Sequence, residues 1–390
     1  MYPDIHVMHE QVGSYDDVRD RIKYEIASGY APNIAYCYPE HVALYNVAGV
    51  VVPLDDFIDN YKVGLSAYQL EDFIDGFYAE GAAYDEEGTM YTLPMSKSTD
   101  LLYYNKTFFE EHGLSVPTTW DEMEAVCAAI KEIDPDCIPL GIDSEANLFI
   151  TLCEQLGTPY TSATGDHFLF DTPENQAFVK MLREWYDKGY FTTAEFAGTY
   201  TSELFKNKIS YMSIGSSAGA RYQLPEAGPD GWPAFAVGIT GIPQFDPANP
   251  KAVSQGPSLC MFKQDNPQEV AATWLFMKFL TTNADFQAEF SMASGYIPVI
   301  ESVKKNPEYA AFLQNAYPTS SGINALAVKV ALENSDSFFR SAAFNGSDFA
   351  RDQVGYLLQY CLLSPANDID AMIDEAFKKA IAECKYQTGN

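Results

Sequence analysis

No apolar run in the sequence is long enough to cross a lipid bilayer, because the longest, such as residues 47–54, falls far short of the roughly 20 residues that a membrane-spanning helix needs. Basic residues are few: 24 Lys and Arg stand against 54 Asp and Glu, a formal net charge of −30 at pH 7. With no basic run, such a chain is not expected to bind nucleic acid or anionic membrane surfaces. Residues 1–4 lack the basic and then apolar start of a signal peptide, so we expect either a cytoplasmic protein or a chain that begins inside a longer one.

Motifs for a disulfide framework or a metal site are also lacking. The cysteines are odd in number and have no C-x-x-C spacing, so we expect mostly buried free thiols at positions 37, 127, 137, 153, 260, 361 and 384. His6 and His9 lie three apart in a strand-like segment and therefore point to opposite faces. The acidic run 143–154 has the spacing of a calcium loop, but Leu148 stands where that loop needs glycine. We expect no metal and no cofactor.

Aromatic residues are what the sequence has in plenty. They make up 14% of the chain and include 26 tyrosines, which suit both a packed core and a surface that stacks on sugar rings. The length of 390 residues predicts two domains or one large one, and the 47% hydrophobic fraction is that of an ordinary globular protein. Disordered and collagen-like classes are therefore excluded.

Helices alternate with short β-rich runs along the chain. Capping residues and apolar spacing predict helices after Ser14, Thr119, Thr172 and Asn266, and an i, i+4 apolar stripe predicts one over 369–381. Strands are expected at 33–38, 100–104, 209–214 and 235–242. This alternation indicates an α/β fold with mainly parallel sheets.

The segment from Gly215 to Gly219 fits the G-x-S-x-G motif of serine hydrolases, with Ser217 as the candidate nucleophile. In that fold the catalytic histidine follows the serine, whereas all five histidines of this chain precede Ser217. A serine hydrolase of this type is therefore nearly excluded. Small residues at a strand-to-helix turn can instead present N–H and hydroxyl groups to an anion or a sugar hydroxyl.

Several ordered segments together resemble the extracellular solute-binding protein family 1, the carbohydrate-type binding proteins of ABC transporters. They are 13–15 (GSY), 31–34 (APNI), 98–106 (STDLLYYNK), 116–122 (VPTTWDE) and 295–298 (GYIP). The match extends over essentially the whole chain. Within the family, the chain is most similar to the glycerol-3-phosphate-binding group.

The resemblance implies a two-lobed α/β fold of the type II periplasmic-binding-protein class, with three crossings between the lobes near residues 100, 259 and 318. Lobe I is expected to contain residues 1–100 and 259–318, and lobe II residues 101–258 and 319–390. The family's first strand and helix are expected to be missing, together with a signal sequence and a lipid-anchoring cysteine. Closure of the hinge around a ligand would be the working motion.

The same resemblance supplies the candidate ligand-binding residues. They are Tyr15, Tyr38, Glu40, Ser98, Glu145, Gly215, Ser216, Ser217, Gly256, Tyr296 and Arg351, with Asn147 near the position where the glycerol-phosphate group has a tryptophan. An arginine fork with hydroxyl and N–H groups suits a phosphate. Because a phosphate would enter against the charge of −30, the balance tilts slightly to a neutral sugar or polyol, with the polyol phosphate kept open.

The predicted function is therefore the extracytoplasmic substrate-binding component of an ABC importer, a monomer with no catalytic residues that delivers its ligand to the permease. Two alternatives stay open. One is a glycan-acting hydrolase with a cleft carboxylate pair, for which Glu40 and Glu145 are the candidates. The other is a ligand-sensing partner of a membrane receptor.

Overall fold

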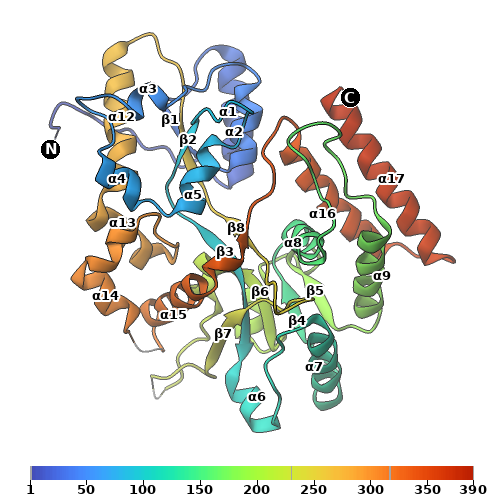
Figure 1. Ribbon diagram of the computed structural model, residues 1–390. Coiled ribbons are helices and arrows are strands. Elements are labelled where there is room, and N and C mark those ends of the chain that lie inside the picture. Colours follow the sequence, from blue (N-terminus) through green and yellow to red (C-terminus); the bar gives the residue numbers. More distant parts are fainter. Residues whose placement is uncertain (1, 230, 316–317, 390) are drawn as a thin grey trace.

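The computed structural model describes residues 2–229, 231–315 and 318–389 (Figure 1). It contains two β-sheets, and each is the centre of one lobe. In lobe I the sheet order is β1 (Ile34–Cys37), β9 (Ser258–Met261), β2 (Thr92–Pro94), and both pairings are antiparallel. The hydrophobic cores of this lobe draw on residues 22–95 and 259–331, so two distant parts of the chain build one lobe.

Helices surround the lobe I sheet. From the first part of the chain come α1 (Tyr15–Ser28), α2 (Pro39–Asn46), α3 (Asp55–Ile58), α4 (Ala67–Asp72), α5 (Asp75–Ala79) and the 3-10 helix η1 (Glu80–Ala82). From the second come α12 (Pro267–Thr282), α13 (Ala284–Ser294), η3 (Glu301–Lys305) and α14 (Pro307–Leu313). Figure 1 shows α12 and α13 on one side of the lobe and α1 and α2 on the other.

The larger sheet lies in lobe II and reaches into the hinge. Its strand order is β10 (Phe338–Phe339), β8 (Ala252–Gln255), β3 (Ser98–Asn105), β6 (Met212–Ser216), β4 (Leu140–Ile142), β5 (Phe191–Thr193), and β7 (Val237–Gly241) also pairs with β3. Its helices are α6 (Lys106–His112), α7 (Trp120–Ile133), α8 (Glu145–Leu156), α9 (Pro173–Asp187), α10 (Ala194–Ala197), α11 (Thr201–Lys206), η2 (Ser217–Gln223), α16 (Ser347–Leu363) and α17 (Ile369–Thr388).

The expectation of mainly parallel sheets is wrong. The long strand β3 runs antiparallel to β6, β7 and β8, and among the described strands only the β4–β5, β4–β6 and β8–β10 pairs are parallel. Alternation of helices and strands predicts parallel pairing when each strand joins its neighbour through a crossover helix. Here β3 carries the chain out of lobe I, and the strands that flank it come from much later parts of the chain and run back.

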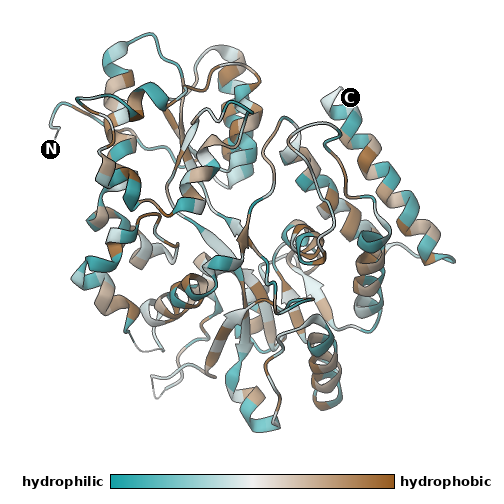
Figure 2. Ribbon diagram, in the orientation of Figure 1, coloured by the Kyte–Doolittle hydropathy of each residue, from teal (hydrophilic) through white to brown (hydrophobic). Residues whose placement is uncertain are grey.

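Local capping accounts for the helices that the sequence predicts correctly. Ser14 and Thr119 form capping boxes at the starts of α1 and α7, and Thr172 and Asn266 cap α9 and α12. Helix α1 ends at Gly29, whose φ of 80° is a left-handed conformation that glycine adopts without strain. Figure 2 shows hydrophilic and hydrophobic residues alternating along α9 and α17, as expected for helices packed by one face.

Three segments connect the lobes. The chain passes from β2 into β3 near residue 97, returns from β8 to β9 near residue 256, and crosses again through α15 (Ser320–Glu333), η4 (Ser335–Ser337) and β10. Helix α15 packs Ala325 and Val328 into the lobe I core and Ile323 and Ala327 against β3 and its neighbours. The boundary expected at residue 318 adjoins residues 316–317, which lie outside the described part, and the lobe boundaries stay predictions.

All seven cysteines are buried free thiols, which agrees with the expectation from their spacing. Among them, the Sγ atoms of Cys37 and Cys260 lie 3.6 Å apart on the neighbouring strands β1 and β9. None of the helices in the described ranges is long and apolar enough to cross a membrane.

Candidate functional site

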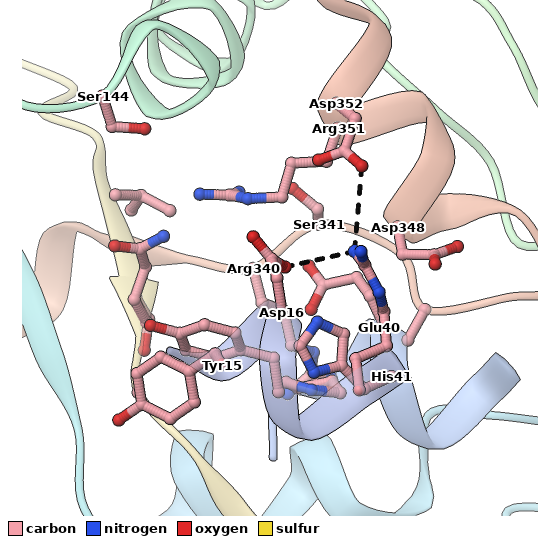
Figure 3. A pocket seen from close by; sticks show the side chains of 18 of the residues that line it. Tyr15, Asp16, Glu40, His41, Ser144, Arg340, Ser341, Asp348, Arg351 and Asp352 are labelled. Carbon is pink, nitrogen blue, oxygen red and sulfur yellow. Dashed lines mark hydrogen bonds and ion pairs between the residues drawn. The ribbon is translucent and has the colours of Figure 1, made fainter. Parts of the chain in front are cut away.

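A cavity of about 390 Å³ lies between the two lobes (Figure 3). Helices α1 and α2 line it from lobe I, strand β8 from the hinge, and α16 with the segment before it from the other side. Its lining consists of Ser14, Tyr15, Asp16, Arg19, Tyr38, Pro39, Glu40, His41, Glu80, Ala83, Ser144, Tyr200, Val253, Ser254, Gln255, Gly256, Arg340, Ser341, Ala343, Asp348, Arg351 and Asp352.

Tyrosines form the lobe I wall of the cavity, because the first turns of α1 and α2 point there. Tyr15 begins α1 and Tyr38 caps α2, and their ring centroids lie 4.4 Å apart. Tyr36 packs on Tyr15 from behind at 5.9 Å, and the hydroxyls of Tyr15 and Tyr296 lie 3.0 Å apart. Burial raises the pKa of the Tyr15 hydroxyl far above its usual value. These phenols therefore stay protonated and can both donate and accept hydrogen bonds.

The first turn of α2 adds a carboxylate and an imidazole to this wall. Burial raises the pKa of Glu40, and the positive charge of Arg351 opposes that shift. His41 is 5% exposed, and its Nδ1 has no hydrogen-bond partner among the described residues. Burial, helped by Arg19 and Arg351, lowers the pKa of His41 to about 3, so the ring is neutral at physiological pH.

Arg351 on α16 is positioned by a polar network that spans three elements. Its guanidinium donates to the amide oxygen of Asn147 on α8 and reaches across the cavity toward Ser144 (Figure 3). The Asn147 amide exchanges two hydrogen bonds of 2.7 Å with Gln255 on β8 and donates to Asp100 on β3 at 3.1 Å. Arg351 makes no ion pair with a carboxylate within the described ranges, so its charge is available to a ligand.

An ion pair joins the two walls of the cavity. Arg19 on α1 lies 3.7 Å from the carboxylate of Asp352 on α16 and pairs with Asp16 at 3.1 Å (Figure 3). It also pairs with Asp20 at 3.0 Å. The Arg19 side chain is 15% exposed, so water screens these contacts less than at an open surface. Its three carboxylate neighbours leave Arg19 with little charge to offer a ligand.

The candidate ligand-binding residues divide into three groups by position. Five line the cavity: Tyr15, Tyr38, Glu40, Gly256 and Arg351. Two lie one hydrogen bond behind the lining, Tyr296 through Tyr15 and Asn147 through Arg351. The others lie outside the lining: Ser98, Glu145, Gly215, Ser216 and Ser217.

The residues outside the lining have structural partners. The Ser217 hydroxyl is fully buried and accepts the backbone N–H of Thr99 at 3.2 Å. Ser216 accepts the N–H of Ala218, and a Cβ added to Gly215 would lie 2.4 Å from a carboxylate oxygen of Asp143. The small residues of this segment thus permit close packing, and two of its hydroxyl groups accept backbone N–H groups of the protein itself.

Ser98 and Glu145 are buried and are not part of the lining either. Ser98 pairs with Gln255 in the β3–β8 ladder. Glu145 is 7% exposed, burial raises its pKa, and the side chain of Thr193 opposes that shift. Because Glu40 lines the cavity and Glu145 does not, this pair cannot flank a ligand bound there.

Sequence reasoning missed several lining residues. On α16, Asp348 precedes Arg351 by three residues and Asp352 by four, so helical periodicity in this region could have identified both aspartates as neighbours of the cavity. Arg19 follows Tyr15 by four residues on α1, which is the same signal. Tyr200 carried no local pattern that could have marked it.

Comparison with known proteins places these observations in a family. The family model described as bacterial extracellular solute-binding protein matches residues 1–316. The chain is 25% identical over 323 residues to a maltotriose-binding protein of Pyrococcus abyssi, a match that covers 79% of this chain but only 63% of that protein. It is 22% identical over 316 residues to the sn-glycerol-3-phosphate-binding periplasmic protein UgpB of Escherichia coli K12, covering 77% and 68%.

Solved structures agree on the fold. UgpB from Mycobacterium tuberculosis, in complex with glycerophosphocholine, superposes with a TM-score of 0.79 at 19% identity, covering 99% of this chain and 92% of that one. Maltose-bound MalE3 from T. maritima gives 0.77 at 18% identity, with the same coverage. The two-lobed fold expected from the resemblance is therefore confirmed, and with its family model matched over residues 1–316 the chain belongs to the bacterial extracellular solute-binding proteins.

Proposed function

We propose that this protein is the substrate-binding component of an ABC importer and that it binds a neutral carbohydrate in the cavity between its lobes. Membership of the extracellular solute-binding family supports the role, and the position of the cavity supports the mode of binding. A ligand there touches both lobes, so it stabilises the closed arrangement over the open one. Binding and closure require no bond to be made or broken.

The observation that carries the proposal is the chemistry of the two facing walls. Tyr15 and Tyr38 offer aromatic surface and hydroxyls, and Glu40 beside them offers a carboxylate to accept hydrogen bonds. Arg351 enters from the opposite lobe with its guanidinium free of any described carboxylate. A polyhydroxylated ligand can donate to Glu40, accept from Arg351 and stack on the rings at the same time.

The charges of the lining favour a neutral ligand over a phosphate. Carboxylates outnumber guanidiniums: Asp16, Glu40, Asp348 and Asp352 face Arg19, Arg340 and Arg351, and a fifth carboxylate, Glu80, is paired with the buried Lys97. Arg19 is occupied by three carboxylates, and Arg340 donates to the carbonyl of Gly76. Arg351 is therefore the lining guanidinium that is bound to neither a carboxylate nor a backbone carbonyl, and a phosphate beside it would also meet Glu40 and Asp348, which have no ion pair among the described residues, in a chain of net charge −30.

A thermal denaturation screen tests the proposal. Maltose, maltotriose, sorbitol, glycerol, glycerol-3-phosphate and glycerophosphocholine would each be added to the purified chain. A ligand at a hundred times its Kd stabilises the native state by about 2.7 kcal/mol, which raises the melting temperature measurably. The proposal expects sugars to raise it more than the phosphates do. Unchanged melting in all six would refute binding, and a larger shift with a phosphate would refute neutrality.

Arg351→Ala separates the two ligand classes further. Loss of the guanidinium should remove most of any stabilisation by glycerol-3-phosphate, because Arg19 pairs with three carboxylates and Arg340 donates to the carbonyl of Gly76. Stabilisation by a neutral sugar should only weaken, since Glu40 and the tyrosines remain. Equal loss for both classes would count against this division of roles.

The remaining parts of the proposal concern the cellular setting. We place the protein outside the cytoplasm, in the periplasm or lipid-anchored at the outer face of the membrane, as a monomer that docks on permease subunits. Light scattering tests the monomer, and uptake of labelled sugar in cells lacking the gene tests the importer. Incubation with malto-oligosaccharides followed by product analysis tests the hydrolase alternative, and sustained turnover would overturn the binding role.

A further inference from the structure

One side chain of the cavity lining combines high exposure with an aromatic ring. Tyr200 is 72% exposed, although it lines the same cavity as Tyr15 and Tyr38. Single exposed tyrosines are common and need no explanation by themselves. Tyr200 differs because it lines the cavity from lobe II, whereas the tyrosine wall belongs to lobe I.

The backbone that carries Tyr200 is firmly anchored. Tyr200 caps α11, and the next residue, Thr201, is fully buried. Both the N–H and the hydroxyl of Thr201 donate to one carboxylate oxygen of Asp143 at 2.8 Å, and that hydroxyl lies 3.0 Å from the Ser213 hydroxyl. Gly215 makes room for this carboxylate, because a Cβ there would lie 2.4 Å from its other oxygen. The Tyr200 ring is thus held at the cavity edge with only its own rotation left to order.

Tyr200 and the tyrosine wall line the same cavity, and Tyr200 also influences the pKa of a member of that wall's network. Burial raises the pKa of the Tyr296 hydroxyl, its hydrogen bond with Tyr15 opposes the shift, and Tyr200 raises it further. Tyr296 in turn shares its hydroxyl contact with Tyr15, the ring that faces the cavity. Aromatic surfaces from both lobes therefore border one space.

We propose that Tyr200 is the lobe II stacking residue, which closes on one face of a pyranose ring whose other face lies on Tyr15 and Tyr38. A pyranose presents C–H groups on its faces, and these pack well on aromatic rings, whereas an acyclic polyol has no such face. Tyr200 would thus select cyclic sugars over acyclic polyols and polyol phosphates. This inference rests on the proposed carbohydrate binding and adds the residue that determines its selectivity.

The experiment compares three variants by calorimetric titration with maltotriose and with sorbitol. Tyr200→Ala removes the ring, Tyr200→Phe keeps the ring without its hydroxyl, and Tyr24→Ala is the matched control. Tyr24 is 77% exposed on α1 and does not line the cavity. We expect Tyr200→Ala to raise the Kd for maltotriose at least about tenfold, which corresponds to about 1.4 kcal/mol, and to change any sorbitol binding less than about twofold. Tyr200→Phe and Tyr24→Ala should keep the wild-type affinity.

Each of the other outcomes refutes one part of the inference. Maltotriose binding by Tyr200→Ala equal to that of Tyr24→Ala would refute the stacking role while leaving carbohydrate binding intact. Equal losses for maltotriose and sorbitol would refute the selectivity. Loss of maltotriose binding in Tyr200→Phe would assign the effect to the hydroxyl instead of the ring. A wild-type protein that does not bind maltotriose refutes the inference, and one that binds nothing in the wider screen refutes the proposed function as well.

Discussion

Replacing Asp100 by asparagine should change the stability of the protein in a pH-dependent way. Asp100 lies in β3, is 8% exposed and accepts a hydrogen bond of 3.1 Å from the Asn147 amide. Burial raises the pKa of its carboxyl from 3.8 to about 6, although the Asn147 hydrogen bond works in the opposite direction. Between about pH 4 and pH 6 the native state therefore binds more protons than the unfolded chain. Stability linked to this group is present below about pH 4 and is lost as pH rises through about 6.

The magnitude follows from the shift in pKa. A rise from 3.8 to about 6 is about two units, and at 1.36 kcal/mol per unit the ionised carboxylate costs about 3 kcal/mol at pH 8. At pH 4 the carboxyl of Asp100 is protonated in the native state, and its raised pKa lowers the free energy of unfolding by only about 0.5 kcal/mol. Asparagine carries no charge at either pH. Any cost of replacing the carboxyl group by an amide is the same at pH 4 and at pH 8. The change of about 2.5 kcal/mol between the two pH values therefore measures the ionisation of Asp100 alone.

Urea denaturation of the wild type and Asp100→Asn at pH 4 and pH 8 measures this difference. The variant should gain about 2.5 kcal/mol relative to wild type on going from pH 4 to pH 8. With an unfolding entropy of about 2.1 cal/mol/K per residue over 390 residues, that gain corresponds to about 3 °C in melting temperature. A stability difference that is the same at both pH values would refute the raised pKa and the dry environment behind it.

Asp246→Asn provides a control of opposite sign. Asp246 is in an exposed turn, where the Asn249 side chain and then the backbone N–H of Ala248 lower the pKa of its carboxyl. Stability linked to Asp246 is therefore present at neutral pH and is lost as pH falls through its lowered pKa. Asp246→Asn should lose stability at pH 8 relative to pH 4, the reverse of Asp100→Asn.

Three further predictions concern the hinge and the cavity. Asp352→Asn should raise the Kd for a sugar about 1.5- to 5-fold, because the ion pair of Asp352 with Arg19 joins the lobes and such pairs contribute about 0.2–1 kcal/mol. A loss of affinity that does not become smaller in high salt would contradict this. Lys97→Met should lower the free energy of unfolding in urea by about 3–5 kcal/mol, because the buried Glu80 carboxylate, 2.5 Å from Nζ of Lys97, loses its counter-charge. Adding Glu80→Gln should recover part of this loss. A double variant no more stable than the single one would argue against the pair. Gly256→Ala should lower the stability measured by thermal unfolding by about 1–3 kcal/mol, because the φ of Gly256 is +109° and a Cβ would lie 2.4 Å from a backbone carbonyl oxygen. An alanine variant with wild-type stability would disprove this strain.

Much of the local structure could be predicted from the sequence. The helices after Ser14, Thr119 and Thr172 begin where expected because a side-chain oxygen and a backbone N–H three residues later meet within one turn. The direction of strand pairing could not be predicted, because β3 has the same pattern whether its neighbours run parallel or antiparallel. Those neighbours come from residues 212–255, and only the return of the chain to the hinge sets their direction.

The candidate site shows the same division. Tyr15, Tyr38, Glu40, Gly256 and Arg351 came from resemblance to a family, and they do lie around one cavity. The serines at 216 and 217 and the glycine at 215 came from the same resemblance and from a local motif, yet their partners are backbone groups and a buried carboxylate. A motif records which residues are small or polar, but not what they touch.

By itself, the sequence determined the α/β class, the helix starts, the acidic surface and the family resemblance, because each depends on composition or on residues a few positions apart. Only the tertiary structure decided which polar groups share the cavity and which arginines are paired with carboxylates. Arg351 faces Tyr15 and Glu40, and Arg19 pairs with Asp352, across nearly the full length of the chain. Contacts between such distant residues exist only when both lobes are folded, so the charge balance on which the proposed neutral ligand rests is a property of the assembled cleft.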